Sequence, residues 1–210
     1  MRKTDERRID MNYILASKSP RRKEILENIG LHFHIVTVPT DETCAEHDPC
    51  RYVTELAVRK GHAVLEQLQK NGKLTPDTLI IASDTVVACN GEVLGKPQDR
   101  TDAARMLKMF SDKTHTVVSG VAILSENHTA VDAEITEVVF DKIPPHEIDL
   151  YTATDEPYDK AGAYAIQGFA SLWIKGIRGD YFNVVGFPVK RFSEMLKREF
   201  GISLADEIGK

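Results

Sequence analysis

The 210-residue chain has few cysteines, no long apolar run and no excess of basic residues. Its three cysteines, Cys44, Cys50 and Cys89, are an odd and unclustered set, which argues against a disulfide framework and favours a reducing compartment. No apolar run approaches the roughly 20 residues that a membrane-spanning helix needs. Lys and Arg number 27 against 32 Asp and Glu, and the net charge of −5 argues against long nucleic acid as a partner.

Several common site motifs are also missing. No Gly-x-x-x-x-Gly-Lys-Ser/Thr occurs, which excludes a Walker-type phosphate loop. Gly162 and Gly168 are too far apart for a dinucleotide fingerprint, and no pair of the seven histidines has metal-ligand spacing. Any site that recognises phosphate must therefore be a local cluster of residues that belongs to neither of these motifs.

The composition is that of a globular protein, with 42% hydrophobic and 28% charged residues. Residues 1–12 are charged in both signs and lack the apolar segment of a secretion signal, so we expect an exposed leader and a cytoplasmic protein. No repeat or linker interrupts the remainder. We expect one domain over 13–204 and a short tail at 205–210.

Apolar runs, periodicity, caps and turn residues predict the order of the elements. Asn90-Gly91 between two short apolar runs is a strong hairpin signal. Strands are expected at 13–16, 33–38, 79–82, 86–89, 92–94, 115–124 and 131–143, and helices at 20–29, 49–71, 101–110, 147–154 and 189–200. This mixture predicts an α/β fold with a mixed sheet flanked by helices, either as one compact unit or in two lobes around a cleft.

The first predicted helix begins in an unusual way. Ser19 is placed as its N-cap and Pro20 as its first residue, yet Arg21, Arg22 and Lys23 fill the first turn. Cations are unfavourable by ~0.3–1 kcal/mol each at a helix N-terminus, where an anion would be favoured. The segment is either a capped surface helix with solvated cations or a phosphate cradle that also uses Ser17.

Two further charged residues interrupt apolar patterns. Lys60 lies within the apolar stripe of the second predicted helix, either as a snorkelling lysine or as an ammonium pointed into a cleft. Asp84 directly follows an apolar strand, where it either caps a turn or lies in a cleft at the strand end.

Lys96, between Gly95 and Pro97, and Glu42 in an acidic loop are weak signals alone. Together with the basic first turn they supply lysines, separated carboxylates and an anion cradle. This set suits metal-assisted attack on a polyphosphate.

The sequence resembles the Maf family, nucleotide pyrophosphatases also called septum-formation proteins. The resemblance runs from about Tyr13 to Leu204 and rests on six segments in the family's order: Leu15–Arg22, Ser83–Val87, Gly95–Pro97, His115–Val121, Asp159–Gly168 and Gly179–Pro188. Each segment is modest alone, and their order over one domain makes the signal strong.

The resemblance implies an elongated fold like that of inosine triphosphatases, with a cleft between two lobes. The family's catalytic aspartate falls on Asp84, which would accept a proton from water or help to hold Mg²⁺ or Mn²⁺, and its cleft glutamate falls on Glu42 as a second metal ligand. The positions that contact phosphate fall on Ser17, Ser19, Arg21, Lys60 and Lys96. A homodimer is a further implication.

Three positions are implied to read the base: Arg22, Thr85 and Gln167. This combination is similar to that of members acting on dTTP and UTP, and an amide such as Gln167 both donates and accepts hydrogen bonds. The chain departs from the common pattern at Lys18, Ser83 and Ser119, and none of these removes a group that the chemistry needs.

We therefore expect an enzyme that cuts dTTP and UTP to the monophosphate and pyrophosphate by water attack at the α-phosphorus. The alternatives are the same chemistry on 7-methyl-GTP or other pyrimidine nucleotides, and a division-linked protein that binds nucleotide without cutting it. An inert scaffold would leave the basic first turn and Lys60 unexplained.

Overall fold

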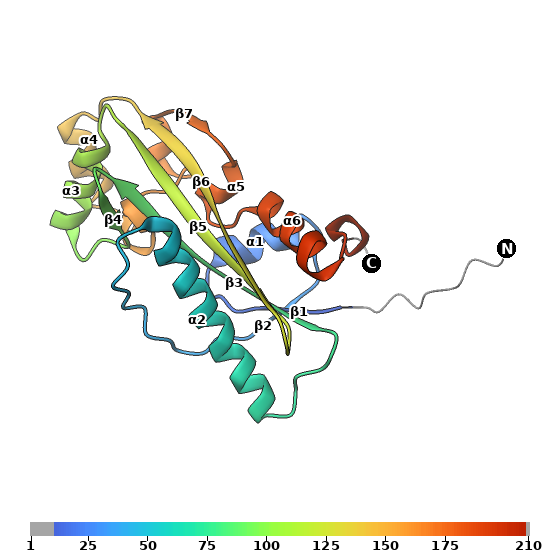
Figure 1. Cartoon of the computed structure of the whole chain (residues 1–210). Helices are drawn as coiled ribbons and strands as arrows, with labels where there is room; N and C mark the ends of the chain where they lie inside the picture. The colour runs from blue at the N-terminus through green and yellow to red at the C-terminus, as the bar shows by residue number, and fades with distance from the viewer. Residues whose placement is uncertain (1–10, 209–210) are drawn as a thin grey trace.

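The computed structural model describes residues 11–208, and among them seven strands form one mixed sheet (Figure 1). The sheet order is β2-β1-β3-β5-β6-β7, with β4 paired to β3. β1 runs parallel to both of its neighbours, and every other pairing is antiparallel. The strands are β1 Asn12–Leu15, β2 His34–Ile35, β3 Thr78–Cys89, β4 Glu92–Leu94, β5 Thr114–Leu124, β6 Thr129–Phe140 and β7 Ile174–Arg178.

Helices cover both faces of the sheet (Figure 1). The long helix α2 lies across β3 and β5 on one face, and α1 and α6 pack on the other. The α-helices are α1 Pro20–Asn28, α2 Pro49–Lys70, α3 Arg100–Phe110, α4 Pro145–Tyr151, α5 Tyr181–Val185 and α6 Val189–Phe200. Short 3-10 helices follow at η1 Glu156–Asp159, η2 Ala161–Ala163, η3 Phe169–Leu172 and η4 Leu204–Asp206.

Local signals place the starts of α1 and α2 and the hairpin as predicted. Ser19 and Asp48 are the N-caps of α1 and α2, and each is followed by a proline in the first turn. Asn90 and Gly91 have φ values of 52° and 80°, the left-handed pair that a tight hairpin requires. The mixed α/β fold expected from the sequence is confirmed.

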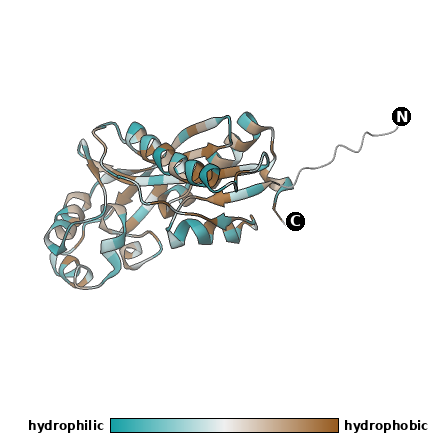
Figure 2. Ribbon diagram, turned by 90° about the horizontal axis from the view of Figure 1, so that it is seen from below, coloured by the Kyte–Doolittle hydropathy of each residue, from teal (hydrophilic) through white to brown (hydrophobic). Residues whose placement is uncertain are grey.

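The hydrophobic core is divided along the length of the sheet. One core forms where α3 and α4 pack near Phe110, Phe140 and Trp173. The other cores lie under α1, α6 and α2, at the opposite end of β3 and β5. Figure 2 shows apolar segments concentrated in the strands, while the helices on the two faces carry both polar and apolar segments. The molecule is therefore elongated, with two packed ends.

Several boundaries differ from the prediction. β3 is one strand of 12 residues, where two separate strands were expected. β2 has only His34 and Ile35, and β6 ends at Phe140 instead of reaching 143. α4 begins at Pro145 because Pro144 serves as its extended N-cap residue, two residues before the expected start.

Most of the expected leader, residues 1–10, and the last two residues of the expected tail, 209–210, lie outside the described residues. Asn12, which was assigned to the leader, belongs to β1, and η4 extends the ordered chain beyond 204. Among residues 11–208, no helix is both long and apolar enough to cross a membrane.

Candidate active site

One edge of β3 is left uncovered at its middle. β1 pairs with β3 as far as Leu15 and Ile81, and β4 pairs with it from Val87 onward. Within residues 11–208, the stretch 82–86 therefore has a strand partner only on its β5 side. A cavity of about 640 Å³ opens at this gap, lined by the start of α1, the loop after β2, α2, the middle of β3, the turn after β4, η1, η2 and the end of α5.

Asp84 lies inside β3, opposite Gly120 of β5. The expectation that it ends a strand or caps a turn was wrong, because β3 continues through it to Cys89. A strand interior accommodates this carboxylate because its neighbours on the same face of β3, Ala82 and Val86, belong to separate hydrophobic clusters, so the position falls between two cores. The residue is only 9% exposed and needs a charged partner.

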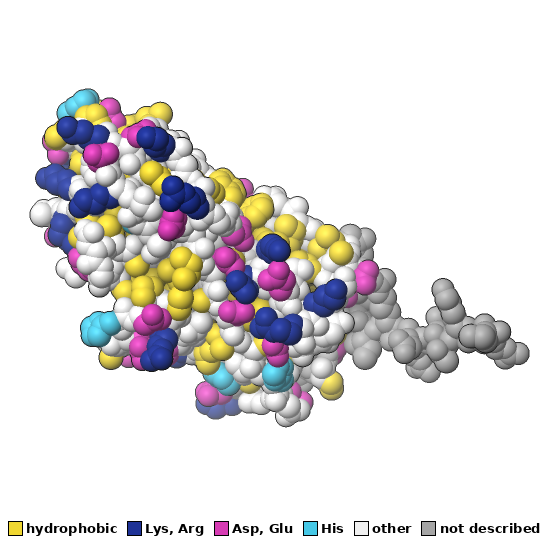
Figure 3. Space-filling model, turned by 45° about the horizontal axis from the view of Figure 1, so that its top comes forward, with side chains coloured by type: hydrophobic (Ala, Val, Ile, Leu, Met, Phe, Trp, Pro, Cys, Tyr) yellow, Lys and Arg dark blue, Asp and Glu magenta, His cyan; other side chains and the backbone are white. Residues whose placement is uncertain are grey.

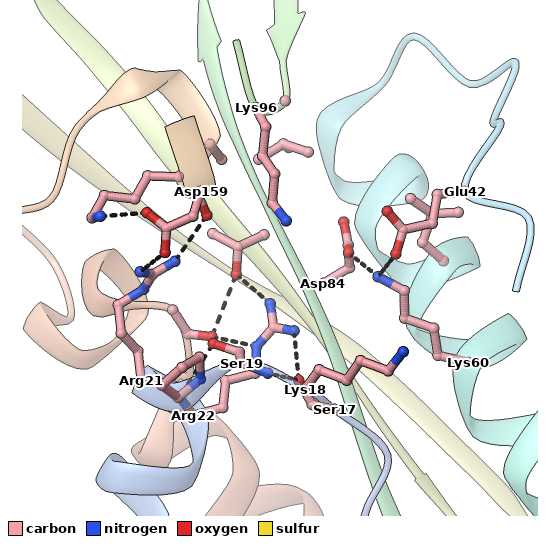
Figure 4. Close-up of a pocket in the computed structure, with 18 of the residues that line it drawn as sticks. Ser17, Lys18, Ser19, Arg21, Arg22, Glu42, Lys60, Asp84, Lys96 and Asp159 are labelled. Carbon is pink, nitrogen blue, oxygen red and sulfur yellow. Dashed lines mark hydrogen bonds and ion pairs between the residues drawn. The ribbon is translucent and has the colours of Figure 1, made fainter. Parts of the chain in front are cut away.

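Lys60 of α2 is that partner. Its Nζ donates to Asp84 Oδ1 at 2.7 Å and lies 2.8 Å from Glu42 Oε1 (Figure 4). The lysine side chain is 17% exposed and lines the cavity, so of its two readings the structure supports an ammonium in the cleft. Two carboxylates from distant segments thus meet at one cation.

Glu42 is carried by the loop between β2 and α2. The hydrogen bond from Lys60 lowers the pKa of its carboxyl group, Lys60, Lys96 and Arg22 lower it further through their charges, and partial burial opposes the shift. Glu42 is consequently an anion at neutral pH.

The two arginines in the basic first turn of α1 bind different partners. Arg22 turns back to protein acceptors: its Nε donates to the Gly186 carbonyl at 2.9 Å, and its Nη1 donates to the Ser83 carbonyl at 2.8 Å. Ser83 lies in the stretch of β3 that has no strand neighbour on the side away from β5, so the guanidinium supplies a hydrogen bond at that edge. Burial lowers the pKa of Arg22, opposed by the Asp84 charge.

Two of the predicted base-reading residues contact each other. Arg22 Nη2 donates to Thr85 Oγ1 at 3.0 Å, and Thr85 Oγ1 lies 2.8 Å from Ser119 Oγ of β5. Gln167, the third, lines the cavity from the segment after η2 and is exposed. Arg22 and Thr85 therefore form a rigid wall, whereas the Gln167 amide is open to a ligand.

Arg21 reaches across the cavity to η1. Its Nη1 lies 3.0 Å from Asp159 Oδ2, and its Nη2 donates to the Asp159 carbonyl at 3.3 Å. Lys160 donates to the other oxygen of Asp159. The pair links α1 to η1, as Figure 4 shows. The segment that carries Gln167 follows η1 and η2 in the chain.

The remaining predicted phosphate contacts line the same cavity. Ser17 Oγ accepts from the Ser19 backbone N–H at 3.2 Å and from Arg22 Nη1 at 3.3 Å, and Ser19 Oγ caps α1. Lys18 and Lys96 also line it, with no hydrogen bond or ion pair to any residue from 11 to 208. Lys96 points into the space between Asp84 and Asp159 (Figure 4).

Sequence reasoning assigned no role to Asp159 or Lys160, although both line the cavity. The only available signal was the motif that contains them, because Asp159 is 138 positions from the arginine it binds. All ten predicted site residues converge on this one cavity: Ser17, Ser19, Arg21, Arg22, Glu42, Lys60, Asp84, Thr85, Lys96 and Gln167.

Known proteins resemble the chain over nearly its whole length. Residues 12–199 match the family model described as Maf-like protein. The dTTP/UTP pyrophosphatase of Pelotomaculum thermopropionicum is 46% identical over 91% of this chain and 97% of that protein. The dTTP/UTP pyrophosphatase of Caldanaerobacter subterraneus subsp. tengcongensis is 44% identical over 91% of each chain.

Among solved structures, the Ham1 protein of Staphylococcus aureus aligns over 94% of this chain and 93% of its own, with a TM-score of 0.46 and 14% identity. The family model spans all of the segments that build the cavity, and the curated relatives exceed 40% identity. The chain therefore belongs to the Maf family.

Proposed function

We propose that this protein is a nucleoside triphosphate pyrophosphatase that hydrolyses dTTP and UTP to the monophosphate and pyrophosphate. The observation that carries the proposal is the meeting of Asp84, Glu42 and Lys60 in a cavity walled by cations. The relatives named dTTP/UTP pyrophosphatase support the same activity.

The charge of the cavity suits a polyphosphate. Its lining includes six Lys or Arg residues and three Asp or Glu residues, so the balance is positive although the whole chain is acidic. The cations are Lys18, Arg21, Arg22, Lys60, Lys96 and Lys160, and the anions are Glu42, Asp84 and Asp159. Low-dielectric walls strengthen such a local field.

The outer surface contrasts with the cavity. On the face shown in Figure 3, basic and acidic side chains are intermingled over both ends of the molecule. Neither this face nor the net charge favours long nucleic acid, and a free nucleotide fits better.

A divalent cation fits the carboxylates. Mg²⁺ and Mn²⁺ prefer oxygen ligands, and Mg²⁺ is commonly held by one or two carboxylates together with substrate phosphates and water. In the described part of the chain, no cluster of three His, Cys, Asp or Glu could hold a metal. Asp84 and Glu42 would therefore share a cation with the nucleotide, and that cation would stabilise charge on the phosphate oxygens.

The protein's own groups divide the chemistry between them. Lys60, Lys96 and the N–H donors that Arg21 retains beyond Asp159 neutralise the triphosphate. A water oxygen forms a bond to the α-phosphorus while the bond to the bridging oxygen breaks, and the electron pair leaves on pyrophosphate. Asp84 accepts the water proton, holds the cation, or does both.

Gln167 is the residue that we assign to the base edge, against a wall made by Arg22 and Thr85. A cytoplasmic location is proposed from the three free cysteines. A homodimer stays a prediction. Activity on 7-methyl-GTP or other pyrimidine nucleotides, and nucleotide binding without hydrolysis, are the rivals.

The deciding experiment measures pyrophosphate release from dTTP, UTP, CTP, GTP, ATP and 7-methyl-GTP, with Mg²⁺ or Mn²⁺ and with a chelator. We expect metal-dependent release from dTTP and UTP in preference to the others. Preference for another base would discard the assignment of Arg22, Thr85 and Gln167 while keeping the chemistry. A folded protein that released pyrophosphate from none would refute the enzyme.

A further inference from the structure

The loop that carries Glu42 has little main-chain support. It lies between Ile35, where β2 ends, and Pro49, where α2 begins. Among the described residues, positions 37–47 make no backbone-to-backbone hydrogen bond in the loop or to a neighbouring element. A segment of this kind opens at low cost unless side chains hold it. The position of the Glu42 carboxylate therefore depends on side-chain tethers.

Arg59 of α2 is the principal tether. Its Nη1 donates to the Asp41 carbonyl at 2.7 Å and to the Thr43 carbonyl at 2.8 Å, so one nitrogen grips the residues on both sides of Glu42. Its Nη2 donates to Glu55, one turn earlier on α2. The guanidinium is thus oriented by the helix and holds the loop backbone.

The next residue of the helix holds the side chain of the same glutamate. Lys60 Nζ lies 2.8 Å from Glu42 Oε1 and 2.7 Å from Asp84 Oδ1. Arg59 and Lys60 together constrain Glu42 at its backbone and at its carboxylate. A helix of 22 residues that packs on β3 and β5 is a rigid base for both.

We infer that Arg59 is a positioning residue of the reaction, which places Glu42 beside Asp84 without touching the nucleotide. Arginine suits this role because its planar fork presents two N–H groups on one nitrogen and further donors on the others. The inference rests on the proposed function, in which Glu42 is a catalytic carboxylate.

A purely stabilising role is the competing explanation. The Arg59–Glu55 pair is a partly exposed i,i+4 ion pair, and such pairs contribute little to stability. Glu55→Gln removes the charge of that pair and keeps an amide oxygen that can still accept from Cys44 Sγ, which lies 3.4 Å from Glu55 Oε2. Activity should therefore stay within about twofold, because the bonds to the Asp41 and Thr43 carbonyls remain. The hydrogen bonds from Arg59 to the loop carbonyls, and not the ion pair with Glu55, account for the loss of activity that we expect when Arg59 is changed.

The test is a double-mutant cycle. Arg59→Met keeps an apolar stem of similar length and removes every donor, and Glu42→Gln removes the carboxylate that the tether is meant to place. We expect Arg59→Met to lower kcat/KM for dTTP by about 10–100-fold, the cost of a misplaced group. Adding Arg59→Met to Glu42→Gln should lower kcat/KM by less than about twofold further, because both changes act through the Glu42 carboxylate.

Two controls accompany the cycle. Arg51→Met changes a second arginine of α2, which is exposed and whose side chain has no bond within residues 11–208, and should leave kcat/KM unchanged. Arg59→Lys should recover part of the lost activity because an ammonium still donates to a carbonyl.

Limited proteolysis supplies a readout that needs neither metal nor nucleotide. Cleavage within residues 37–47 should be faster in Arg59→Met than in the unmodified protein, with cleavage elsewhere in the chain unchanged. Additive losses in the double variant, or an unchanged rate of cleavage in the loop, would overturn the inference. If the unmodified protein cleaves no nucleotide, the proposed function fails, and the proteolysis result alone still decides whether Arg59 tethers the loop.

Discussion

At the scale of residues, the cavity separates cations that the protein already uses from cations that it leaves open. Arg22 is bound to backbone carbonyls and Thr85, and Lys60 is bound to two carboxylates. Lys18 and Lys96 have no such partner between residues 11 and 208. The engaged cations shape the site, and the open ones are the first available to phosphate oxygens.

Asp84 is the residue on which the chemistry should depend most. Asp84→Asn keeps the size and a hydrogen-bonding group but removes the negative charge, so we expect kcat for dTTP to fall by at least ~100-fold, as for loss of an acid–base group. Asp149→Asn, an exposed carboxylate of α4 outside the cavity, should change kcat by less than twofold.

Pyrophosphate release and thermal unfolding of both variants provide the check. Near-normal turnover by Asp84→Asn would remove Asp84 from the centre of the reaction. Nucleotide binding that persists in this variant, with no activity in the unmodified protein to lose, would favour the binding-protein rival.

At the scale of elements, the site depends on how closely α2 approaches the sheet. Gly120 of β5 pairs with Asp84, and a Cβ built on it would lie 2.5 Å from the Val53 carbonyl oxygen of α2. The absence of a side chain at Gly120 lets the helix lie against β5 beside the Asp84 carboxylate. This contact sets how far Lys60, which lies further along the same helix, must reach.

Gly120→Ala should therefore destabilise the protein and impair the site. A clash with main-chain atoms is relieved only by moving α2, and we expect a loss of about 1–3 kcal/mol in the free energy of unfolding. Gly176→Ala in β7, where a Cβ would meet nothing within 4 Å, should cost less than about 0.5 kcal/mol.

Urea unfolding and kcat/KM for dTTP would be measured on both glycine variants. Equal free energies of unfolding for Gly120→Ala and Gly176→Ala would show that α2 can accommodate a Cβ at position 120 without loss of stability. A loss of stability without a loss of activity would show that the distance between α2 and β3 does not control the reaction.

At the scale of the whole molecule, the end of the sheet near α3 contains a buried ionisable side chain. The core near α3 encloses His115, which is 2% exposed, stacks on Phe110 and lies 2.7 Å from the Tyr164 hydroxyl through its Nε2. Burial lowers the pKa of His115 to about 3. The folded protein therefore holds this imidazole neutral, while the unfolded chain protonates it near pH 6.5.

Protonation of the unfolded chain makes this end of the molecule sensitive to acid. The contribution of the neutral His115 imidazole to the free energy of unfolding is fully present above pH 6.5. It is lost as the pH falls from there towards 3, because only the unfolded state takes up the proton. Glutamine at position 115 cannot titrate. Between pH 7.5 and pH 5.0 we therefore expect the free energy of unfolding of His115→Gln to fall by about 2 kcal/mol less than that of the unmodified protein.

Urea denaturation at the two pH values measures this difference, and the carboxylates shared by both proteins cancel in the comparison. Parallel pH dependence in the two proteins would show that His115 is protonated in the folded state. Loss of the Tyr164 hydrogen bond lowers stability at both pH values and does not affect the difference.

The elements were largely predictable because their signals are local. Ser19, Asp48 and the Asn90-Gly91 pair act within a few residues of themselves, so caps and the hairpin could be read directly. β3 was divided in two because Asp84 and its polar neighbours interrupt an apolar pattern. Nothing within that segment reveals that the interruption falls between two cores.

The sequence by itself determined the α/β class, the starts of α1 and α2 and the residues that carry unusual charge, because each depends on neighbours along the chain. Only the tertiary structure decided that Arg22 faces protein carbonyls, that Asp159 binds Arg21, and that Arg59 holds the Glu42 loop. These contacts join segments that are up to 164 positions apart. Their partners are set by the register of the sheet and the packing of α2, which no local pattern encodes.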